Sequence, residues 1–335
     1  MSSDVIDRLP KAELHVHLEG TLEPQLLLDL AARNKIPVPW SSAGELREEY
    51  AFSSLEHFLS LLFRGAQVLR QAQDFYDLTR AYLARAARDQ VRRAEVFFGS
   101  QTFLDAGVPI SSQLDGIFAA IDDARTDFGV SAEVILTSQR HRPNSTALEL
   151  VELTLPWHHR ILGFGLSGAE RNNPPSKFVD YFALCRRLGF RTTIHAGEDG
   201  PSSYVREALD LCHADRIDHG VSAAEDPDLV ARLRDEQIPL TMCPLSNRQL
   251  KVTPDLATHP LAQLHNAGVM VTVNSDDPPY FGGYINDNYR AVRDALGLTS
   301  DELAALAINS FTASFADQTD IDAGATEVHA VRAGQ

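Results

Sequence analysis

The sequence predicts a (β/α)8 barrel, and three observations lead to that prediction. Short β-rich runs alternate with amphipathic helical stretches along most of the 335 residues. The runs number eight, which is the strand count of that barrel. Several runs end in or near histidines or lead into carboxylates, at the position where barrel enzymes keep their chemistry. The predicted strands are AELHVH (12–17), AEVFF (94–98), AEVILT (132–137), ILGFGL (161–166), FRTTIH (190–195), DRIDHG (215–220), IPLTMC (238–243) and VMVTVNS (269–275).

The connection after the first strand is too long for a simple crossover. It contains helical segments such as SSLEHFLSLLFRGAQVL and QDFYDLTRAYLARAARDQVR. We therefore predict a helical cap at about 20–90 on a single domain that spans residues 1–335. The cap either roofs the barrel mouth or is an ordinary helical subdomain.

The later connections and the chain end complete the predicted fold. Stretches such as PSKFVDYFALCRRLG and DPDLVARLRDEQ supply helices between strands. YRAVRDALGL and SDELAALAINSFTASF are predicted closing helices, the second with Ser300 or Asp301 as its N-cap. The polar tail DQTDIDAGATEVHAVRAGQ carries little structural signal.

The charge and composition exclude several classes of partner. A net charge of −16 argues against binding to nucleic acid or an anionic membrane, because both need clustered cations. A small neutral or cationic substrate fits better. No apolar run reaches the ~20 residues that span a bilayer, and the N-terminus lacks the apolar core of a signal peptide. Together with three cysteines that form no C-x-x-C pair, this predicts a cytoplasmic protein; a homo-oligomer is compatible with the sequence.

Two histidines in the first predicted strand indicate a metal site. His15 and His17 flank one valine, so their imidazoles share a face of the strand. By itself this pattern also fits a partly buried strand. The fifth strand ends in His195, and the eighth leads into Asp276. Three imidazole nitrogens and one carboxylate oxygen suit zinc better than magnesium or calcium.

We predict one zinc ion per subunit. A two-metal site is the competing arrangement, but the related two-metal barrels use a bridging lysine, and the fourth strand, ILGFGL, has none. His219, at the end of the sixth strand, is placed to orient a water and accept its proton. Glu198 in HAGEDG is a candidate general acid, with an orienting role toward a ligand as its alternative. Asp277 either bonds the substrate or forms a turn before Pro278.

With these residues assembled, the sequence resembles the adenosine/adenine deaminase family of the amidohydrolase superfamily. The resemblance runs from about residue 8 to residue 310, through ELHVHLEGTLEP, HAGE, DHG, CPLSN and NSDDP. It implies hydrolytic deamination of an aminopurine at C6 and the zinc ligands His15, His17, His195 and Asp276. It further implies that Glu198 protonates N1, that His219 handles the attacking water, that Asp277 bonds N7, and that the backbone N–H of Gly168 contacts the purine.

Within the family, the sequence looks closest to the adenine deaminase branch. Adenosine deaminases usually carry aspartate where this chain has Glu19, and the longer side chain would crowd a ribose. The first prediction is therefore conversion of adenine to hypoxanthine and ammonia. Gln101 is a second candidate for substrate contact.

The chain also departs from the adenine branch. That branch reads close to FFDPQTH after its second strand, where this chain has FFGSQTF with Gly99, Ser100 and Phe103. Its fourth strand ends close to GLDSSE, where this chain has GLSGAE, nearer the adenosine type. An apolar wall at Phe103 would suit a 6-substituted or otherwise modified aminopurine; adenosine is the other alternative substrate.

Two further classes of function remain as alternatives. One is a barrel metallohydrolase of amides or phosphoesters, since a fold alone does not select a substrate. The absent lysine and the HAGE and SDDP motifs argue against it. The other is a non-enzymatic descendant of a deaminase, which would require a lost acid or base, yet Glu198 and His219 are both present.

Overall fold

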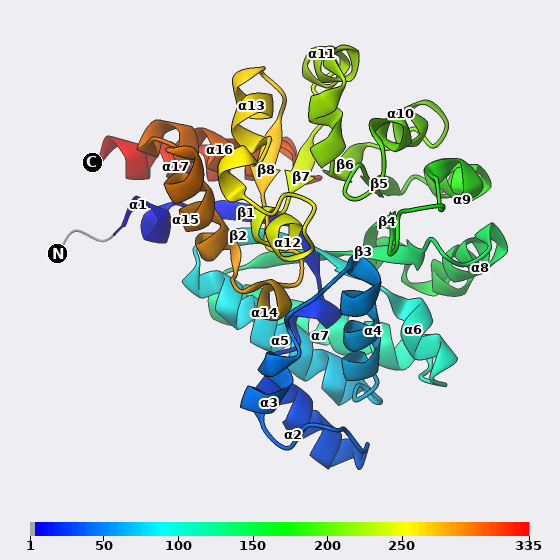
Figure 1. The fold of residues 1–335 in the computed structure, drawn as a ribbon. Helices are drawn as coiled ribbons and strands as arrows, with labels where there is room; N and C mark the ends of the chain where they lie inside the picture. The colour runs from blue at the N-terminus through cyan, green and yellow to red at the C-terminus, as the bar shows by residue number, and fades with distance from the viewer. Residues whose placement is uncertain (1–3, 335) are drawn as a thin grey trace.

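The computed structural model describes residues 4–334 and confirms the predicted barrel. Its eight strands form one sheet in sequence order, with every neighbouring pair parallel (Figure 1). The strands are β1 (Lys11–His17), β2 (Val91–Phe98), β3 (Ser131–Gln139), β4 (Ile161–Ser167), β5 (Arg191–Ala196), β6 (Arg216–His219), β7 (Leu240–Met242) and β8 (Val271–Val273). The last three are shorter than predicted at both ends, where the outer residues of each prediction belong to the adjoining loops.

The first strand closes the barrel against the residues that follow the last one. The backbone N–H of His17 donates to the carbonyl of Asp276 at 2.9 Å, and the N–H of Asp276 donates to the carbonyl of His15 at 3.0 Å. Val16 and Asp276 form a parallel bridge. This seam places the residues after β8 beside the end of β1.

A register shift in β1 separates Glu13 from the two histidines. The shift lies between Glu13 and Val16 in the pairing with β2. The carboxylate of Glu13 accepts hydrogen bonds from the hydroxyl of Tyr82 at 2.8 Å and from the backbone N–H of Ser275 at 3.2 Å. Such a bulge changes which residues share a face. Glu13 therefore ties β1 to a surrounding helix and to the residue before Asp276.

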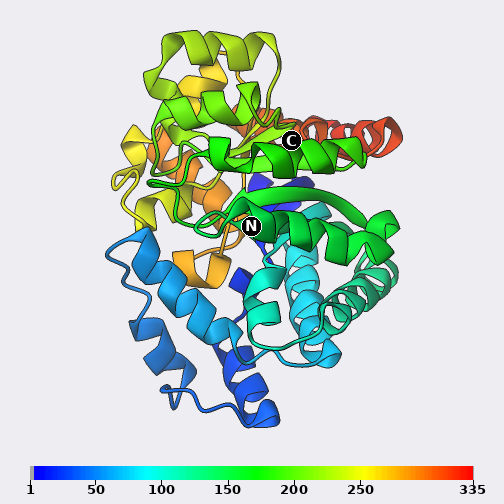
Figure 2. The ribbon, with the colours of Figure 1, turned by 90° about the vertical axis from the view of Figure 1, so that its right-hand side faces the viewer.

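The long connection after β1 contains η1 and four α-helices. They are η1 (Glu19–Thr21), α2 (Pro24–Asn34), α3 (Ala43–Glu48), α4 (Leu55–Ala66) and α5 (Ala72–Arg88). Helix α5 packs against α7 and β2 as a member of the helical ring, so the part that stands outside the ring is α2 to α4 (Figures 1 and 2).

The remaining helices surround the barrel and close the chain. They are α1 (Val5–Arg8), α6 (Ser100–Asp105), α7 (Ile110–Phe128), α8 (Asn144–Thr154), η2 (Leu155–Arg160), η3 (Pro175–Phe178), α9 (Val179–Arg187), α10 (Ser202–Asp210), η4 (Val221–Glu225), α11 (Pro227–Asp235), α12 (Pro244–Gln249), η5 (Leu256–Thr258), α13 (Leu261–Asn266), α14 (Pro278–Phe281), α15 (Ile285–Leu296), α16 (Ser300–Thr312) and α17 (Gln318–Ala333). The N-cap of α16 is Thr299, one residue before the prediction, because Thr299 and Glu302 form a capping box. The polar tail forms α17, which packs on α16.

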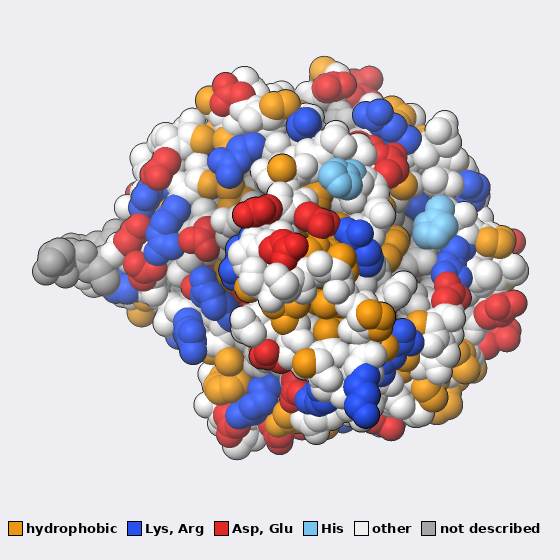
Figure 3. All heavy atoms as spheres, turned by 60° about the horizontal axis from the view of Figure 1, so that its bottom comes forward, with side chains coloured by type: hydrophobic (Ala, Val, Ile, Leu, Met, Phe, Trp, Pro, Cys, Tyr) orange, Lys and Arg blue, Asp and Glu red, His pale blue; other side chains and the backbone are white. Residues whose placement is uncertain are grey.

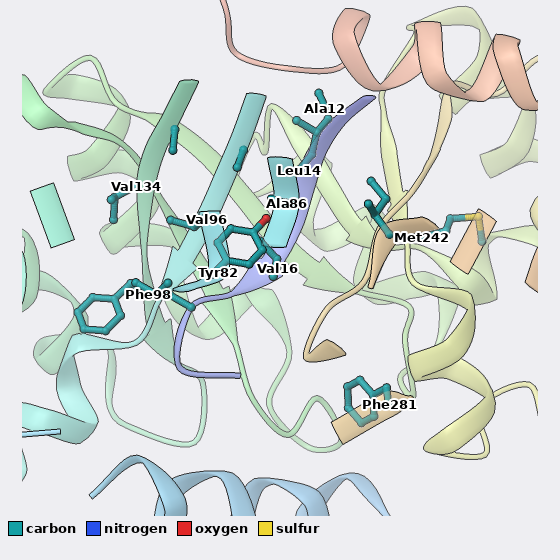
Figure 4. Packing of buried hydrophobic residues seen from close by; sticks show 14 of the residues in the cluster. Ala12, Leu14, Val16, Tyr82, Ala86, Val96, Phe98, Val134, Met242 and Phe281 are labelled. Carbon is teal, nitrogen blue, oxygen red and sulfur yellow. The ribbon is translucent and has the colours of Figure 1, made fainter. Parts of the chain in front are cut away.

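The space between strands and helices is a continuous hydrophobic core. Figure 4 shows part of it, with Val16 and Val96 from the strands and Tyr82 and Ala86 from α5. The three cysteines are free and buried. None of the helices in residues 4–334 is both long and apolar enough to cross a membrane. On the face shown in Figure 3, acidic and basic side chains are interspersed.

A buried ion pair lies inside the sheet, away from the barrel mouth. Arg216, the first residue of β6, donates to Glu95 of β2 at 2.6 Å, and both side chains are fully buried. Glu95 also accepts from the side chain of Arg93 at 2.9 Å and from the backbone N–H of Phe315 at 2.7 Å. The pair connects β2 to β6 across the barrel, and the bond from Phe315 attaches the segment after α16 to the same carboxylate.

Loss of the Glu95 charge should destabilise the fold strongly. In Glu95→Gln, two guanidinium groups lose their shared counter-charge, and we expect the free energy of unfolding to fall by about 3 to 5 kcal/mol. Urea unfolding followed by circular dichroism measures this change. The control is Glu327→Gln, which removes an exposed ion pair with Arg92 and should cost less than about 1 kcal/mol. Equal losses in the two variants would contradict the role given to the buried pair.

Candidate functional site

The four predicted metal ligands converge at the mouth of the barrel. His15 and His17 come from β1, His195 from β5, and Asp276 from the loop after β8. The Nε2 atoms of His17 and His195 are 3.1 Å apart. Oδ1 of Asp276 lies 3.4 Å from Nε2 of His15 and 3.4 Å from Nε2 of His17. Four candidate donor atoms from three widely separated segments therefore surround one centre.

The hydrogen bonds of His15 show which of its nitrogens carries the lone pair. Nδ1 lies 3.2 Å from the carbonyl oxygen of Thr241 and 2.9 Å from its hydroxyl. A carbonyl oxygen only accepts, so Nδ1 is assigned as the protonated nitrogen. Nε2 is then the unprotonated one. It is buried and makes no hydrogen bond within residues 4–334, although Oδ1 of Asp276 lies 3.4 Å away.

Asp218 supports two of the imidazoles from behind. Its Oδ2 lies 3.1 Å from Nδ1 of His195, and its Oδ1 accepts from the hydroxyl of Thr241, which in turn contacts His15. Burial opposes ionisation of Asp218, but its contact with His195 holds the pKa below the ordinary range. Carboxylate partners of this kind fix the orientation of metal-binding imidazoles.

A cavity of about 540 Å³, counting the space open at its mouth, lies over this centre. That volume is within the range of small-molecule sites. Its floor consists of polar side chains from the strand ends, and its roof is mainly the apolar face of α4. The lining residues are His17, Glu19, Leu55, Phe58, Leu59, Leu62, Phe63, Gly99, Gln139, Ser167, Gly168, His195, Glu198, His219, Leu250, Asp276, Asp277 and Phe281.

Two buried carboxyl groups in the cavity floor favour their neutral forms. Burial raises the pKa of Glu198 well above its ordinary value, and the negative charge of Asp276 adds to the rise. The pKa of Asp277 is raised by the same two causes in the same order. Oδ1 of Asp277 is buried without a hydrogen-bond partner in the described part of the chain. The floor therefore presents carboxyl groups that are free to bond a ligand.

A chain of hydrogen bonds orients His219. The backbone N–H of Leu261 donates to Nδ1 of His259, so Nε2 of His259 is assigned as the donor to Oδ1 of Asn247 at 3.1 Å. The amide nitrogen of Asn247 then faces Nδ1 of His219 at 3.4 Å. Because an amide nitrogen donates, Nδ1 of His219 is the acceptor, and the hydrogen of the neutral ring is on Nε2. Nε2 is 3.6 Å from Oε2 of Glu198 and 3.9 Å from Oδ2 of Asp276. Burial lowers the pKa of His219, which favours the neutral ring.

Glu19 and Gly99 meet at the side of the cavity. Oε1 of Glu19 accepts from the backbone N–H of Gly99 at 3.0 Å, while Oε2 is buried with no hydrogen-bond partner within residues 4–334. A Cβ at position 99 would lie 2.6 Å from Oε1, so this approach requires glycine. Burial raises the pKa of Glu19 to about 7. Gly168, at φ +95°, also lines the cavity.

Three residues from the segment after β2 lie elsewhere than expected. Gln101 is behind the cavity wall, where its amide accepts from the backbone N–H of Gln139 and donates to the carbonyl of Thr146. Phe103 stacks on Phe98 at a ring distance of 5.4 Å. Ser100 is buried, and among the described residues it is Gly99, and neither Ser100 nor Phe103, that lines the cavity. The expected apolar wall at Phe103 is therefore wrong.

A family model described as adenosine deaminase matches residues 10–330 of this chain. The chain belongs to the adenosine deaminase family. Curated relatives include an adenine deaminase of Rhodopseudomonas palustris, 48% identical over 92% of this chain and 90% of the relative. An adenine deaminase of Cupriavidus necator is 50% identical over 93% of this chain and 89% of its own length.

Solved structures of similar proteins have the same fold. The crystal structure of an adenine deaminase from Arthrobacter aurescens superimposes with a TM-score of 0.94 at 45% identity and covers 96% of this chain and 98% of its own. An amidohydrolase from Burkholderia ambifaria, whose structure has bound Zn, gives a TM-score of 0.90 at 26% identity over 98% of this chain and 93% of its own. The match to this deaminase family extends over the whole barrel.

Several residues of the site lie outside the sequence motifs that carry the family resemblance. Gln139 and Ser167 end β3 and β4, so their position at strand ends is a signal that could have found them. His259 stands in no motif of the sequence, yet it is buried and bonds Asn247. The apolar side chains of α4 have the spacing of any amphipathic helix, and only the tertiary structure shows that they face a cavity.

A side chain at position 20 should displace a floor residue of this deaminase-family site. A Cβ on Gly20 would overlap Oδ1 of Asp277 and lie 2.8 Å from its Cβ. We expect Gly20→Ala to fold but to lose about 100-fold in deaminase kcat/KM, because displacements near 1 Å have that effect. Circular dichroism and ammonia release measure the two outcomes. Gly44→Ala is the control, since its Cβ meets only Ser42 Oγ, at 3.8 Å; native activity in Gly20→Ala would contradict the expected displacement.

Proposed function

We propose that this chain is a zinc-dependent adenine deaminase that converts adenine and water to hypoxanthine and ammonia. The observation that carries the proposal is the convergence of His15, His17, His195 and Asp276 beside the buried acid Glu198 in one cavity. The similarity to adenine deaminases at about 50% identity supports the choice of substrate. The bound Zn in the amidohydrolase from Burkholderia ambifaria supports the choice of metal.

The donor atoms fit a zinc ion. Nε2 of His15 is a buried, unprotonated nitrogen with no hydrogen-bond partner among the residues described. Burying such a polar atom destabilises the fold unless a ligand binds its lone pair. His17 and His195 direct their own Nε2 atoms to the same centre. Three imidazoles and one carboxylate form the kind of donor set that zinc prefers. When bound, zinc lowers the pKa of a coordinated water toward 7 and so supplies a nucleophile at neutral pH.

Glu198 supplies the proton for the purine ring. Addition of oxygen at C6 moves electron density onto N1, so the ring needs a proton at that nitrogen. A buried carboxyl group that is neutral before the reaction can deliver that proton. Water thus adds across the N1=C6 bond: its oxygen bonds to C6, Glu198 gives its proton to N1, and the proton released by the water restores the Glu198 carboxyl group. The remaining proton of the C6 hydroxyl then passes to the amino group, which leaves as ammonia while the C6–O bond becomes a carbonyl.

His219 and Asp277 orient the reactants on either side of C6. Nε2 of His219 faces Glu198 and Asp276, so its hydrogen can orient the attacking oxygen. With the tautomer assigned above, His219 acts as a donor, whereas its strand-end position in the sequence predicts a proton acceptor. The unpartnered Oδ1 of Asp277 is available for N7 of the purine. Gly168 lines the same cavity at a backbone conformation that favours glycine.

Glu19 favours a free base over a nucleoside. Its carboxyl group is held against Gly99 and fills space beside the cavity. Its second oxygen, Oε2, is available to bond a ring N–H that a ribose would replace in adenosine. A buried polar group that loses its partner discriminates strongly between substrates.

We also infer that the cap and the barrel act as one domain. Leu55, Phe58 and Leu62 of α4 line the cavity together with groups from the strand ends, so the site includes parts of both. An apolar roof excludes water and strengthens the electrostatic interactions beneath it. This arrangement favours the roof over a helical subdomain without a role in the site.

Adenine should be the preferred substrate. We expect the purified, zinc-loaded protein to release ammonia from adenine with kcat/KM at least about 100-fold above that for adenosine, the discrimination typical of a lost polar contact. A panel that also includes N6-methyladenine, followed by ammonia release and hypoxanthine formation, measures it. Preference for adenosine or for the N6-substituted base would reject the proposed substrate.

The variant Glu19→Asp provides the specificity control. The shorter carboxyl group should leave the Gly99 contact and open space at the ribose side. We expect its adenosine-to-adenine ratio of kcat/KM to rise by about tenfold or more. An unchanged ratio would show that Glu19 does not determine the choice.

Removal of the metal should abolish activity reversibly. We expect chelator-treated protein to keep less than about 1% of its activity and to recover with about one equivalent of Zn²⁺. Elemental analysis should find His17→Ala depleted of zinc, whereas His158→Ala, which changes an exposed histidine on η2, should keep it. Full activity without bound metal would refute the metal requirement.

A further inference from the structure

A buried carboxylate that the proposed mechanism does not use holds the loop carrying Glu198. Glu170 follows β4 in GLSGAE and is fully buried. Its Oε1 accepts from the backbone N–H of Gly197 at 2.6 Å. Its Oε2 accepts from the backbone N–H groups of Glu198 at 2.9 Å, Asp199 at 3.1 Å and Gly200 at 2.9 Å. Four successive amides thus converge on one carboxylate, like the backbone nests that bind anions.

The glycines of HAGEDG allow the backbone to wrap this carboxylate. A Cβ on Gly200 would lie 2.5 Å from Cδ of Glu170. Gly197 has φ +74°, and a Cβ there would lie 2.7 Å from Oγ of Ser222. Side chains at either position would push the loop off Glu170. The hydrogen bonds of the loop to Glu170 therefore explain why positions 197 and 200, on either side of Glu198, are glycines.

Arg140 fixes the other end of the same segment. It is fully buried after β3, and its Nη1 donates to the carbonyl oxygen of His195 at 2.6 Å. Its Nε donates to the carbonyl oxygen of Asn173, whose own N–H donates to the carbonyl of Glu170. Burial raises the pKa of Glu170, and the positive charge of Arg140 and the backbone N–H groups oppose that rise. Residues 195–200 are thus held from the ends of β3 and β4.

We propose that Glu170 is a positioning residue for the general acid, because its four backbone hydrogen bonds set where the Glu198 carboxyl group stands. Glu170 is absent from the residues lining the cavity and acts through the loop alone. The inference rests on the proposed role of Glu198. It predicts that Glu170 matters for proton delivery more than for substrate binding.

The variant Glu170→Gln tests this role. It keeps the shape of the side chain but sets an NH₂ group against at least one backbone N–H. We expect kcat for adenine to fall by about 10- to 100-fold, KM to change by less than about threefold, and zinc content to stay native. Glu207→Gln is the matched control. Glu207 accepts one backbone N–H, that of Ser176, away from the cavity, and its loss should change kcat by less than about twofold.

A double-mutant cycle separates positioning from general destabilisation. In the Glu198→Gln background, measured at high enzyme concentration, the further change Glu170→Gln should lower the residual kcat by less than about threefold. A merely structural role would give the same loss in both backgrounds, and that result would overturn the proposal. So would a Glu170→Gln single variant with kcat within threefold of native.

A second variant and a second readout keep the proposal testable if Glu170→Gln does not fold. Gly200→Ala retains the charge but pushes the carboxylate away, so it should show the same loss of kcat with little change in KM. Hydrogen exchange of the amides of residues 197–200 should accelerate by about tenfold or more in either variant and not in Glu207→Gln. Native exchange rates there would overturn the anchoring. Absence of adenine turnover by the native chain would reject the proposed function instead, and the exchange measurement would still decide the anchoring.

Discussion

The hydrogen-bonded seam between β1 and the residues after β8 is the constraint on which the site depends. It closes the barrel, and it places Asp276 beside His15 and His17, which lie at the other end of the chain. Asp276 adopts φ +63°, a conformation that costs a non-glycine residue about 1 kcal/mol or more. Glu13 offsets part of this strain, because its carboxylate accepts from the backbone N–H of Ser275 and fixes the residue just before the turn. The fold and the candidate metal centre therefore share the same few backbone contacts.

The barrel contains two kinds of buried polar group: charges that are paired with one another and atoms that have no hydrogen-bond partner. Away from the mouth, Glu95 and Arg216 form a fully buried ion pair, so each charge has a counter-charge that offsets part of its desolvation cost. At the mouth, His15 Nε2, Glu19 Oε2 and Asp277 Oδ1 are buried without hydrogen-bond partners within residues 4–334. Each such atom destabilises the free protein by a desolvation cost that no contact offsets. These three atoms are ones that a metal ion or a purine can bond, so a ligand in the cavity would remove their share of that cost.

The sequence predicted the strands, their order and the residues that meet at the centre, because the period of two and the strand-end position of His195 and Asp276 are local signals. It could not predict the bulge in β1, which depends on pairing with β2. It placed Phe103 in the cavity on the evidence of a motif, whereas the ring packs on Phe98 in the core. The helix α17 was also missed, since its contact with α16 relies on a few small or apolar residues such as Gly324 and Val328 in a polar segment. Residues whose role depends on tertiary contacts, such as Glu170 and His259, have no sequence period that marks them.

The division of the cavity into an apolar roof and a polar floor decides how selective it can be. The leucines and phenylalanines of α4 contact whatever lies beneath them, and an added or missing methyl group changes such contacts by only about 1 to 3 kcal/mol. The floor is different, because a ligand that fails to bond Asp277 or Glu19 leaves a buried oxygen unpaired. The roof contributes by excluding water that would otherwise take the ligand's place on those oxygens. Selectivity for a purine with particular ring nitrogens therefore arises in the floor, and the apolar helix above it makes that selectivity effective.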